Sequence, residues 1–158
     1  ITSLTDVAIA FPVDFITAIS DTASVDLTVA AGTLSADVKS TVLDSGLYTP
    51  TITAVTNITA TTTYEAQWSR VENIVTVSGK VDIDPTLPAA TTSIGISLPV
   101  ASNIGTEEDC SGTAASSATA GMSARIIGDA ANNRAQLDTI PGSPVNNSWS
   151  YIFQYEVI

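Results

Sequence analysis

The side chains that could carry acid–base chemistry in this chain are carboxylates. Asp82 and Asp84 alternate along one predicted strand and so share a face, and Glu107, Glu108 and Asp109 form an acidic run. Two carboxyl groups that flank a glycosidic bond can hydrolyse it, so the first four are candidates for a polysaccharide depolymerase. The alternative is a solvated strand face and a charged loop that limit edge-to-edge aggregation. We favour this alternative, because acidic residues are abundant here, and predict no catalytic residue.

The chain has few residues that could bind a metal ion or act as a thiol nucleophile, since it contains one cysteine and no histidine. Acidic residues can supply oxygen ligands to Ca²⁺, but the chain contains no twelve-residue calcium-loop pattern. The single cysteine, Cys110, directly follows the acidic run. Neighbouring negative charge raises the pKa of a thiol and makes it a poorer nucleophile. We therefore expect a structural thiol, with no metal site and no cofactor.

Aromatic side chains could instead form a platform on which a sugar stacks. The candidates are Trp68, Trp149, Tyr48, Tyr64, Tyr151 and Tyr155. Their alternation along predicted strands favours packing in a core or between subunits, because large aromatics dominate core energetics. Asn57-Ile58-Thr59 and Asn146-Asn147-Ser148 fit the N-glycosylation acceptor pattern. Such matches arise easily by chance in a chain with 23 Thr and 18 Ser.

The composition excludes several classes of protein. The 158 residues include no histidine, which removes Ser-His-Asp and Cys-His nucleophile systems and imidazole-ligated zinc. Five basic and 16 acidic side chains give a formal net charge of −11, which repels phosphate backbones, so we expect no nucleic-acid partner. The longest apolar stretch, Val7–Val13, is far short of the roughly 20 residues that span a bilayer, so we expect no membrane partner.

The same composition indicates a protein that assembles through β-strands. Charged residues make up only 13% of the chain and the mean hydropathy is +0.30. Thr, Val, Gly and Pro recur throughout, and they favour strands and turns over helix interiors. A soluble chain with so few charges buries much of its surface, often against copies of itself. We therefore predict an all-β assembly protein.

Alternation of apolar and polar residues predicts strands along most of the chain. The clearest is Val75–Asp84, whose odd-numbered residues are apolar or glycine. It follows a tight turn predicted at Glu72-Asn73, because Asn tolerates the left-handed region. The other predicted strands are Thr51–Thr59, Tyr64–Val71, Ser93–Leu98, Met122–Ile127, Arg134–Ile140 and Trp149–Val157, while Gly105–Gly121 is ambiguous. Seven or more short strands between Gly, Pro and Asn turns match a β-sandwich or jelly roll, with Trp149–Val157 as a central strand.

An N-terminal hairpin is predicted ahead of this sandwich. Ser24–Val29 and Leu34–Lys39 each alternate on either side of Ala30-Ala31-Gly32. A single hairpin is marginally stable in water, so it must lie on the later domain or on neighbouring chains. The run Phe15–Ser20 predicts another strand of the same segment. We therefore divide the chain into a β-rich stem, residues 1–45, and a sandwich head, residues 46–158.

Several stretches resemble fibre proteins of tailed phages, especially of phages that infect Bacteroidetes. The hairpin resembles a unit of their stems, and the later stretches are similar to a terminal domain of such virion proteins. The later stretches are Gly46–Thr51, Arg70–Gly79, Gly95–Pro99, Glu108–Gly112, Gly128–Ala130 and Phe153–Tyr155. The resemblance implies an intertwined homotrimer, with a thin β-rich stem that carries a globular β head on the surface of a virus particle.

These observations predict a structural, non-enzymatic virion protein, the distal part of a phage head or tail fibre, joined to other capsid or tail proteins. The alternative from the binding class is a receptor- or glycan-binding module that meets a host surface glycan through loop residues. A depolymerase built on Asp82, Asp84, Glu107 or Glu108 is the third hypothesis.

Overall fold

The computed structural model describes the backbone of residues 24–30 and 33–39 and the whole of residues 43–158. The described residues form strands, turns and one short 3-10 helix, with no α-helix among them, which confirms the all-β prediction. The chain comprises two compact units, Ile1–Thr41 and Val42–Ile158. The predicted boundary after residue 45 falls inside strand β3 (Leu43–Tyr48), which lies in the C-terminal unit because it pairs with β6 (Ala66–Val71).

The N-terminal unit contains the predicted hairpin. Strands β1 (Ser24–Ala30) and β2 (Thr33–Lys39) pair antiparallel, with Val25 opposite Val38 and Val29 opposite Leu34. The two strands and the hairpin that the alternation predicted are therefore confirmed. The strand predicted at Phe15–Ser20 lies outside the described residues.

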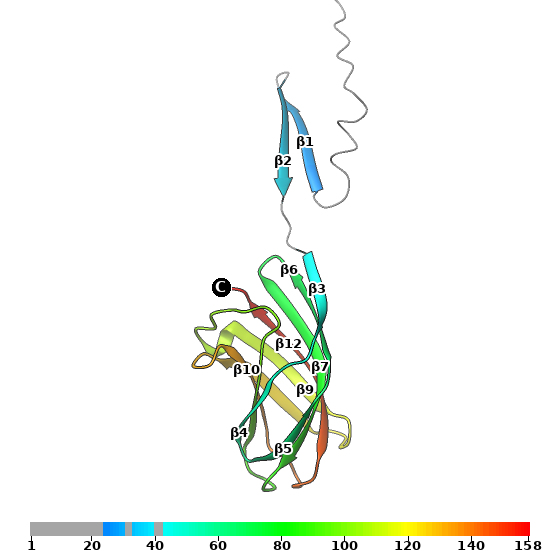
Figure 1. Ribbon diagram of the computed structural model, residues 1–158, viewed down its shortest axis with the longest axis vertical. Coiled ribbons are helices and arrows are strands. Elements are labelled where there is room, and N and C mark those ends of the chain that lie inside the picture. The colour runs from blue at the N-terminus through cyan, green and yellow to red at the C-terminus, as the bar shows by residue number, and fades with distance from the viewer. Residues whose placement is uncertain (1–23, 31–32, 40–42) are drawn as a thin grey trace, which may run out of the picture. The chain divides into compact units, whose positions relative to one another are not determined.

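The C-terminal unit is one antiparallel sheet of ten strands that curls on itself (Figure 1). Along the sheet the order is β3, β6, β7 (Ile74–Pro85), β12 (Asn147–Glu156), β9 (Cys110–Ser116), β10 (Ser123–Asp129), β11 (Arg134–Thr139), β8 (Thr92–Ile96) and β4 (Ile52–Thr56), and β5 (Ile58–Thr63) pairs with β7. Strand β12 is central, as predicted. The finer assignment to a β-sandwich or jelly roll stays a prediction, because hydrogen bonds join all ten strands in one sheet.

The inner face of the curled sheet is the hydrophobic core. Alternate residues of β7 and β12 point inward, and they join Ile94 and Ile96 of β8, Ile126 of β10 and Leu137 of β11 in one buried cluster. Each large apolar side chain buried in this way contributes roughly 1.5–3 kcal/mol. The predicted inward face of Val75–Ile83 is therefore confirmed, since its valines and isoleucine are at most 1% exposed.

The predicted strand Thr51–Thr59 is wrong as a single element. Asn57 has a φ of 57°, in the left-handed region that Asn tolerates, and it separates β4 from β5. Its side-chain amide donates to Leu87 O at 3.0 Å and accepts from Leu87 N at 2.8 Å. These bonds to a distant loop fix the reversal, so that β4 pairs with β8 whereas β5 pairs with β7.

Three smaller features also differ from the sequence-based expectation. The left-handed residue of the β6–β7 turn is Glu72 (φ 55°) rather than Asn73. Tyr64 precedes β6 and is 37% exposed, so it does not share the inward face of that strand. The ambiguous segment forms the 3-10 helix η1 (Glu107–Asp109) and then β9. A side chain at Gly112 would collide with the backbone of Ile152, so β12 can approach β9 only because this residue is small.

Candidate functional site

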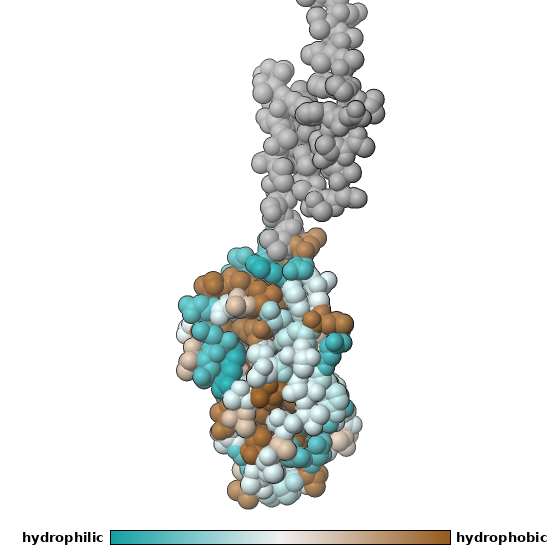
Figure 2. Space-filling view, viewed as in Figure 1, coloured by the Kyte–Doolittle hydropathy of each residue, from teal (hydrophilic) through white to brown (hydrophobic). Residues whose placement is uncertain are grey.

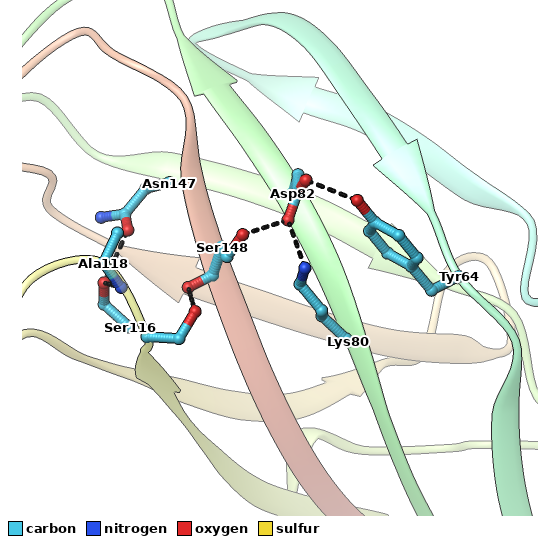
Figure 3. Close-up of polar contacts among 8 residues, drawn as sticks. Tyr64, Lys80, Asp82, Ser116, Ala118, Asn147 and Ser148 are labelled. Carbon is cyan, nitrogen blue, oxygen red and sulfur yellow. Dashed lines mark hydrogen bonds and ion pairs between the residues drawn. The ribbon is translucent and has the colours of Figure 1, made fainter.

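A polar cluster centred on Asp82 lies on the outer face of β7 (Figure 3). Tyr64 Oη donates to Asp82 Oδ2 at 2.8 Å, Ser148 Oγ donates to Oδ1, and Lys80 Nζ lies 3.6 Å from Oδ1. Lys80 Nζ also lies 4.4 Å from the centroid of the Tyr64 ring, within cation–π range. The cluster thereby joins the β5–β6 connection, β7 and β12.

This environment keeps Asp82 ionised. Burial alone would raise the pKa of Asp82, but hydrogen bonds from Ser148 and Tyr64 and the charge of Lys80 outweigh burial and hold that pKa below its ordinary value. A general acid must carry a proton at the working pH. Asp82 therefore has the properties of a structural carboxylate that links strands, and lacks those of a general acid.

The acidic run of η1 and the two aspartates of β7 are not brought into one site. Asp82 lies opposite Ser148 of β12, whereas β9, which begins where η1 ends, starts opposite Tyr155. These positions are seven residues apart on β12, about 23 Å at roughly 3.3 Å per residue. Catalytic pairs in glycosidases are roughly 5–9.5 Å apart. The acidic run in η1 therefore cannot act together with Asp82, nor with Asp84, which lies further along β7.

The acidic run and the thiol have local structural roles. Asp109 Oδ2 accepts hydrogen bonds from the backbone N–H of Gly105 at 2.8 Å and of Thr106 at 3.0 Å, and these bonds lower the pKa of Asp109. Cys110 is 1% exposed, and burial raises its thiol pKa to about 12. The predicted direction of that shift is correct, while its cause is burial instead of the acidic neighbours. Residues 43–158 contain no group of three or more His, Cys, Asp or Glu placed to hold a metal ion.

The six aromatic candidates do not share a platform. Trp149, Tyr151 and Tyr155 lie in the core at 1–4% exposure, next to Phe153. Trp68 and Tyr48 are half-buried against the same core, and Tyr64 belongs to the Asp82 cluster. Of the two glycosylation patterns, Asn57 already uses its amide nitrogen in two hydrogen bonds, whereas Asn146 is exposed.

A polar pocket that the sequence did not predict lies around the start of β4, the β8–β9 loop and the β10–β11 turn. Its volume is about 530 Å³, within the usual range for small-ligand sites. We call it the Arg134 pocket. Its walls are Thr51, Thr53, Ser97, Ser102, Asn132 and Asn133, together with Leu98, Ala101 and Arg134.

The Arg134 side chain is held firmly at this pocket. Its Nε donates to Asp129 Oδ2 at 2.7 Å, and Asn132 Nδ2 donates to both oxygens of Asp129 at 2.8 and 3.0 Å. Burial alone would raise the pKa of Asp129, but these bonds and the charge of Arg134 lower it. The guanidinium lies across Gly95 of β8, where any side chain would collide with it. Arg134 is consequently only 16% exposed.

A larger groove, of about 980 Å³, lies over β9, β10 and β11. Arg125 and Asp138 form an ion pair in it, with Nη2 and Oδ2 3.0 Å apart, and Arg125 is 66% exposed. Asp138 also accepts hydrogen bonds from Ser93 Oγ at 2.6 Å and Gln136 Nε2 at 2.9 Å. The charges of this groove are therefore mutually compensated.

Comparison of the chain with protein-family models, with curated proteins and with solved structures found no match. Among the described residues, no helix has the length and apolar character needed to cross a membrane. The fold and the side-chain geometry define an all-β unit with a curled antiparallel sheet, an aromatic core strand and a polar pocket beside the sheet edge.

Proposed function

We propose that this chain is a structural, non-enzymatic virion protein, the distal part of a phage head or tail fibre, and that it assembles as a homotrimer. In this proposal the curled sheet is a head of the β-sandwich or jelly-roll class, joined through its stem to other capsid or tail proteins. The observation that carries the proposal is the part of the outer face of β3, β6, β7, β12 and β9 that lies between the Asp82 cluster and Glu156, here called the uncharged face, together with the open edge of β3.

The middle of the uncharged face consists of hydroxyl, amide and aliphatic side chains. Strand register places Ser45, Ser69, Thr76, Gln154 and Ser111 in one cross-strand row and Leu47, Gln67, Ser78, Ile152 and Thr113 in the next. The C-terminal unit as a whole has 11 acidic and four basic side chains, a net charge of −7. Identical acidic copies repel one another, so a contact between them is best made through a surface without charge.

The same face exposes aliphatic side chains. Leu43, Val71 and Ile74 are cross-strand neighbours at one end of the face, and Leu47 and Ile152 lie in its second row. Their exposed fractions range from 45% for Ile74 to 71% for Leu43. Figure 2 shows apolar patches, in brown, at the end of the unit where β3 begins. Covering such side chains is the main favourable term in subunit association.

Strand β3 adds an edge that invites pairing. It is the last strand of its sheet, and within the described residues its outer edge has no partner strand. Native proteins protect such edges with charge, proline or a covering loop, and Asp44 is the one charged residue of β3. Leu43 follows the end of the N-terminal unit by two residues. Three associated stems would therefore hold three copies of β3 close to one axis.

The test is the mass of the full chain in solution. A trimer of the 16.2 kDa chain has a mass of about 49 kDa, and it should gain stability with added salt, because salt screens repulsion among three acidic copies. Leu47→Arg and Ile152→Arg should each release folded monomers, since a buried unpaired charge is costly at an interface. Val145→Arg, at a loop residue that is 62% exposed, is the matched control and should remain trimeric. A monodisperse wild-type monomer would contradict the proposal.

A second role in binding a receptor or host surface glycan is compatible with this assembly. The observation that favours it is the Arg134 pocket, whose polar walls are held in place by Asp129 and Asn132.

A further inference from the structure

We propose that the Arg134 pocket binds an uncharged sugar unit of a surface glycan. The inference deepens the glycan-binding candidate and rests on it. It names the site and the class of ligand, and it is independent of the trimeric assembly.

Arg134 has hydrogen-bond donors that its contacts in the described residues do not use. A guanidinium has five N–H donors, and within the described residues Arg134 uses one of them, Nε–H to Asp129. The four N–H groups of its Nη atoms are therefore available to a ligand, in a side chain that is only 16% exposed and lines the pocket. A nearly buried fork of donors that is already fixed in position favours a ligand rich in oxygen acceptors.

The walls of the Arg134 pocket combine polar and apolar side chains. Hydroxyls of Thr51, Thr53 and Ser97 and the amide of Asn133 can each donate and accept, which matches the hydroxyl groups of a sugar. Leu98 and Ala101 supply a small apolar surface for the C–H face of the ring. Small-molecule sites typically combine a few placed polar groups with apolar wall in this way.

The charge distribution favours an uncharged sugar over an acidic one. Asp129 compensates the positive charge of Arg134 at a distance of 2.7 Å, so the pocket itself has no net charge. The C-terminal unit has a net charge of −7 and the chain −11. A carboxylated sugar would therefore approach against a repulsive field, most strongly at low salt.

The β10–β11 turn is held in one conformation by its own hydrogen bonds. Asn133 has a φ of 50°, in the left-handed region, and Asn132 N–H donates to Asp129 O at 3.2 Å. The side-chain bonds between Asn132 and Asp129 close the same turn. A site whose groups are already ordered loses less entropy on binding. Three copies in a trimer would further convert weak single contacts into avid attachment.

The test measures binding of the full chain to a panel of neutral hexose oligosaccharides and to matching oligosaccharides with hexuronate units. At least one neutral oligosaccharide should bind, and its hexuronate counterpart should bind more weakly, with a difference that narrows as salt is added. Arg134→Gln should weaken binding at least about tenfold. Arg125→Gln makes the same change of charge at the exposed ion pair outside the pocket, and it should leave the dissociation constant unchanged.

Two further variants keep the test independent of folding. Asn133→Gly retains the left-handed backbone and removes the amide, and Thr53→Val removes one hydroxyl, while both leave the ion pair of Arg134 intact. Both should weaken binding at unchanged melting temperature. The proposal is overturned if no neutral oligosaccharide binds up to about 10 mM, if the hexuronate form binds more tightly, or if Arg125→Gln weakens binding as much as the pocket variants. If the chain is a trimer that binds no neutral sugar, the sugar-site inference is contradicted and the assembly proposal stands. If the chain is a monomer that binds a neutral sugar, the assembly proposal is contradicted and the sugar-site inference stands.

Discussion

Removal of one oxygen atom from each of two tyrosines of β12 should change stability in opposite directions. Tyr151 and Tyr155 both point into the core, at 4% and 2% exposure. Tyr155 Oη donates to Val100 O at 2.7 Å and accepts from Val100 N at 3.1 Å. Tyr151 Oη is buried and has no hydrogen-bond partner among the described residues. It lies against Gly79, where an added Cβ would be 2.5 Å from it.

The expected magnitudes follow from these contacts. A buried polar atom without a partner costs about 1–3 kcal/mol, so Tyr151→Phe removes that penalty and loses only the packing of one atom. We expect Tyr151→Phe to raise the free energy of unfolding by about 1 kcal/mol. Tyr155→Phe loses two hydrogen bonds and leaves both backbone groups of Val100 unpaired, so it should lower the free energy of unfolding by about 1–3 kcal/mol.

Urea unfolding, followed by far-ultraviolet circular dichroism, measures both variants. Protein concentration must be the same throughout, because the stability of an oligomer depends on it. The two variants should shift the midpoint in opposite directions with an unchanged denaturant slope. Equal destabilisation by both would refute the reasoning, since it would mean that the hydroxyl of Tyr151 is satisfied in the folded state.

Three further predictions concern the core and its titratable groups. Val77→Asp should unfold the C-terminal unit, because Val77 is fully buried and an unpaired carboxylate there costs several kcal/mol. Thr76→Asp, on the outer face of β7, should lower the free energy of unfolding far less. Similar melting temperatures for the two variants would contradict the assignment of inner and outer faces along β7. Asp82→Asn should lower the free energy of unfolding by about 1–2 kcal/mol at pH 7. Because the folded-state pKa of Asp82 is depressed, its contribution is present above pH 3.8 and is lost as pH falls through the folded value, so the variant and wild type should converge in acid urea titrations. Alkaline unfolding should set in between pH 9 and 12, since burial raises the pKa of Cys110 from 9.0 to about 12, and dichroism that is flat to pH 12 would oppose this.

Some of the architecture follows from the sequence because strand alternation is a local property. The inward face of β7 and the aromatic face of β12 repeat every two residues, and that period indicates which face of each strand is buried. The same period predicted the two strands of the N-terminal hairpin. Composition likewise gave the all-β class and the acidic charge. Strand β9 could not be predicted from the sequence, because its Gly112 and Ala114 have little strand propensity of their own. A small residue is needed at Gly112 because β12 approaches closely there.

The tertiary structure settled everything that depends on which distant segments meet. Asn57 ends β4 because its amide bonds to Leu87, thirty residues away, and no local period records that contact. Asp82 and η1 are far apart because Asp82 lies opposite one end of β12, whereas the residue after η1 lies opposite the other end. The sequence shows only that both positions are acidic. The Arg134 pocket needs a glycine on β8 beneath a guanidinium from β11. Local propensity is a property of neighbouring residues, whereas a site is made by side chains that only the folded chain brings within hydrogen-bonding distance.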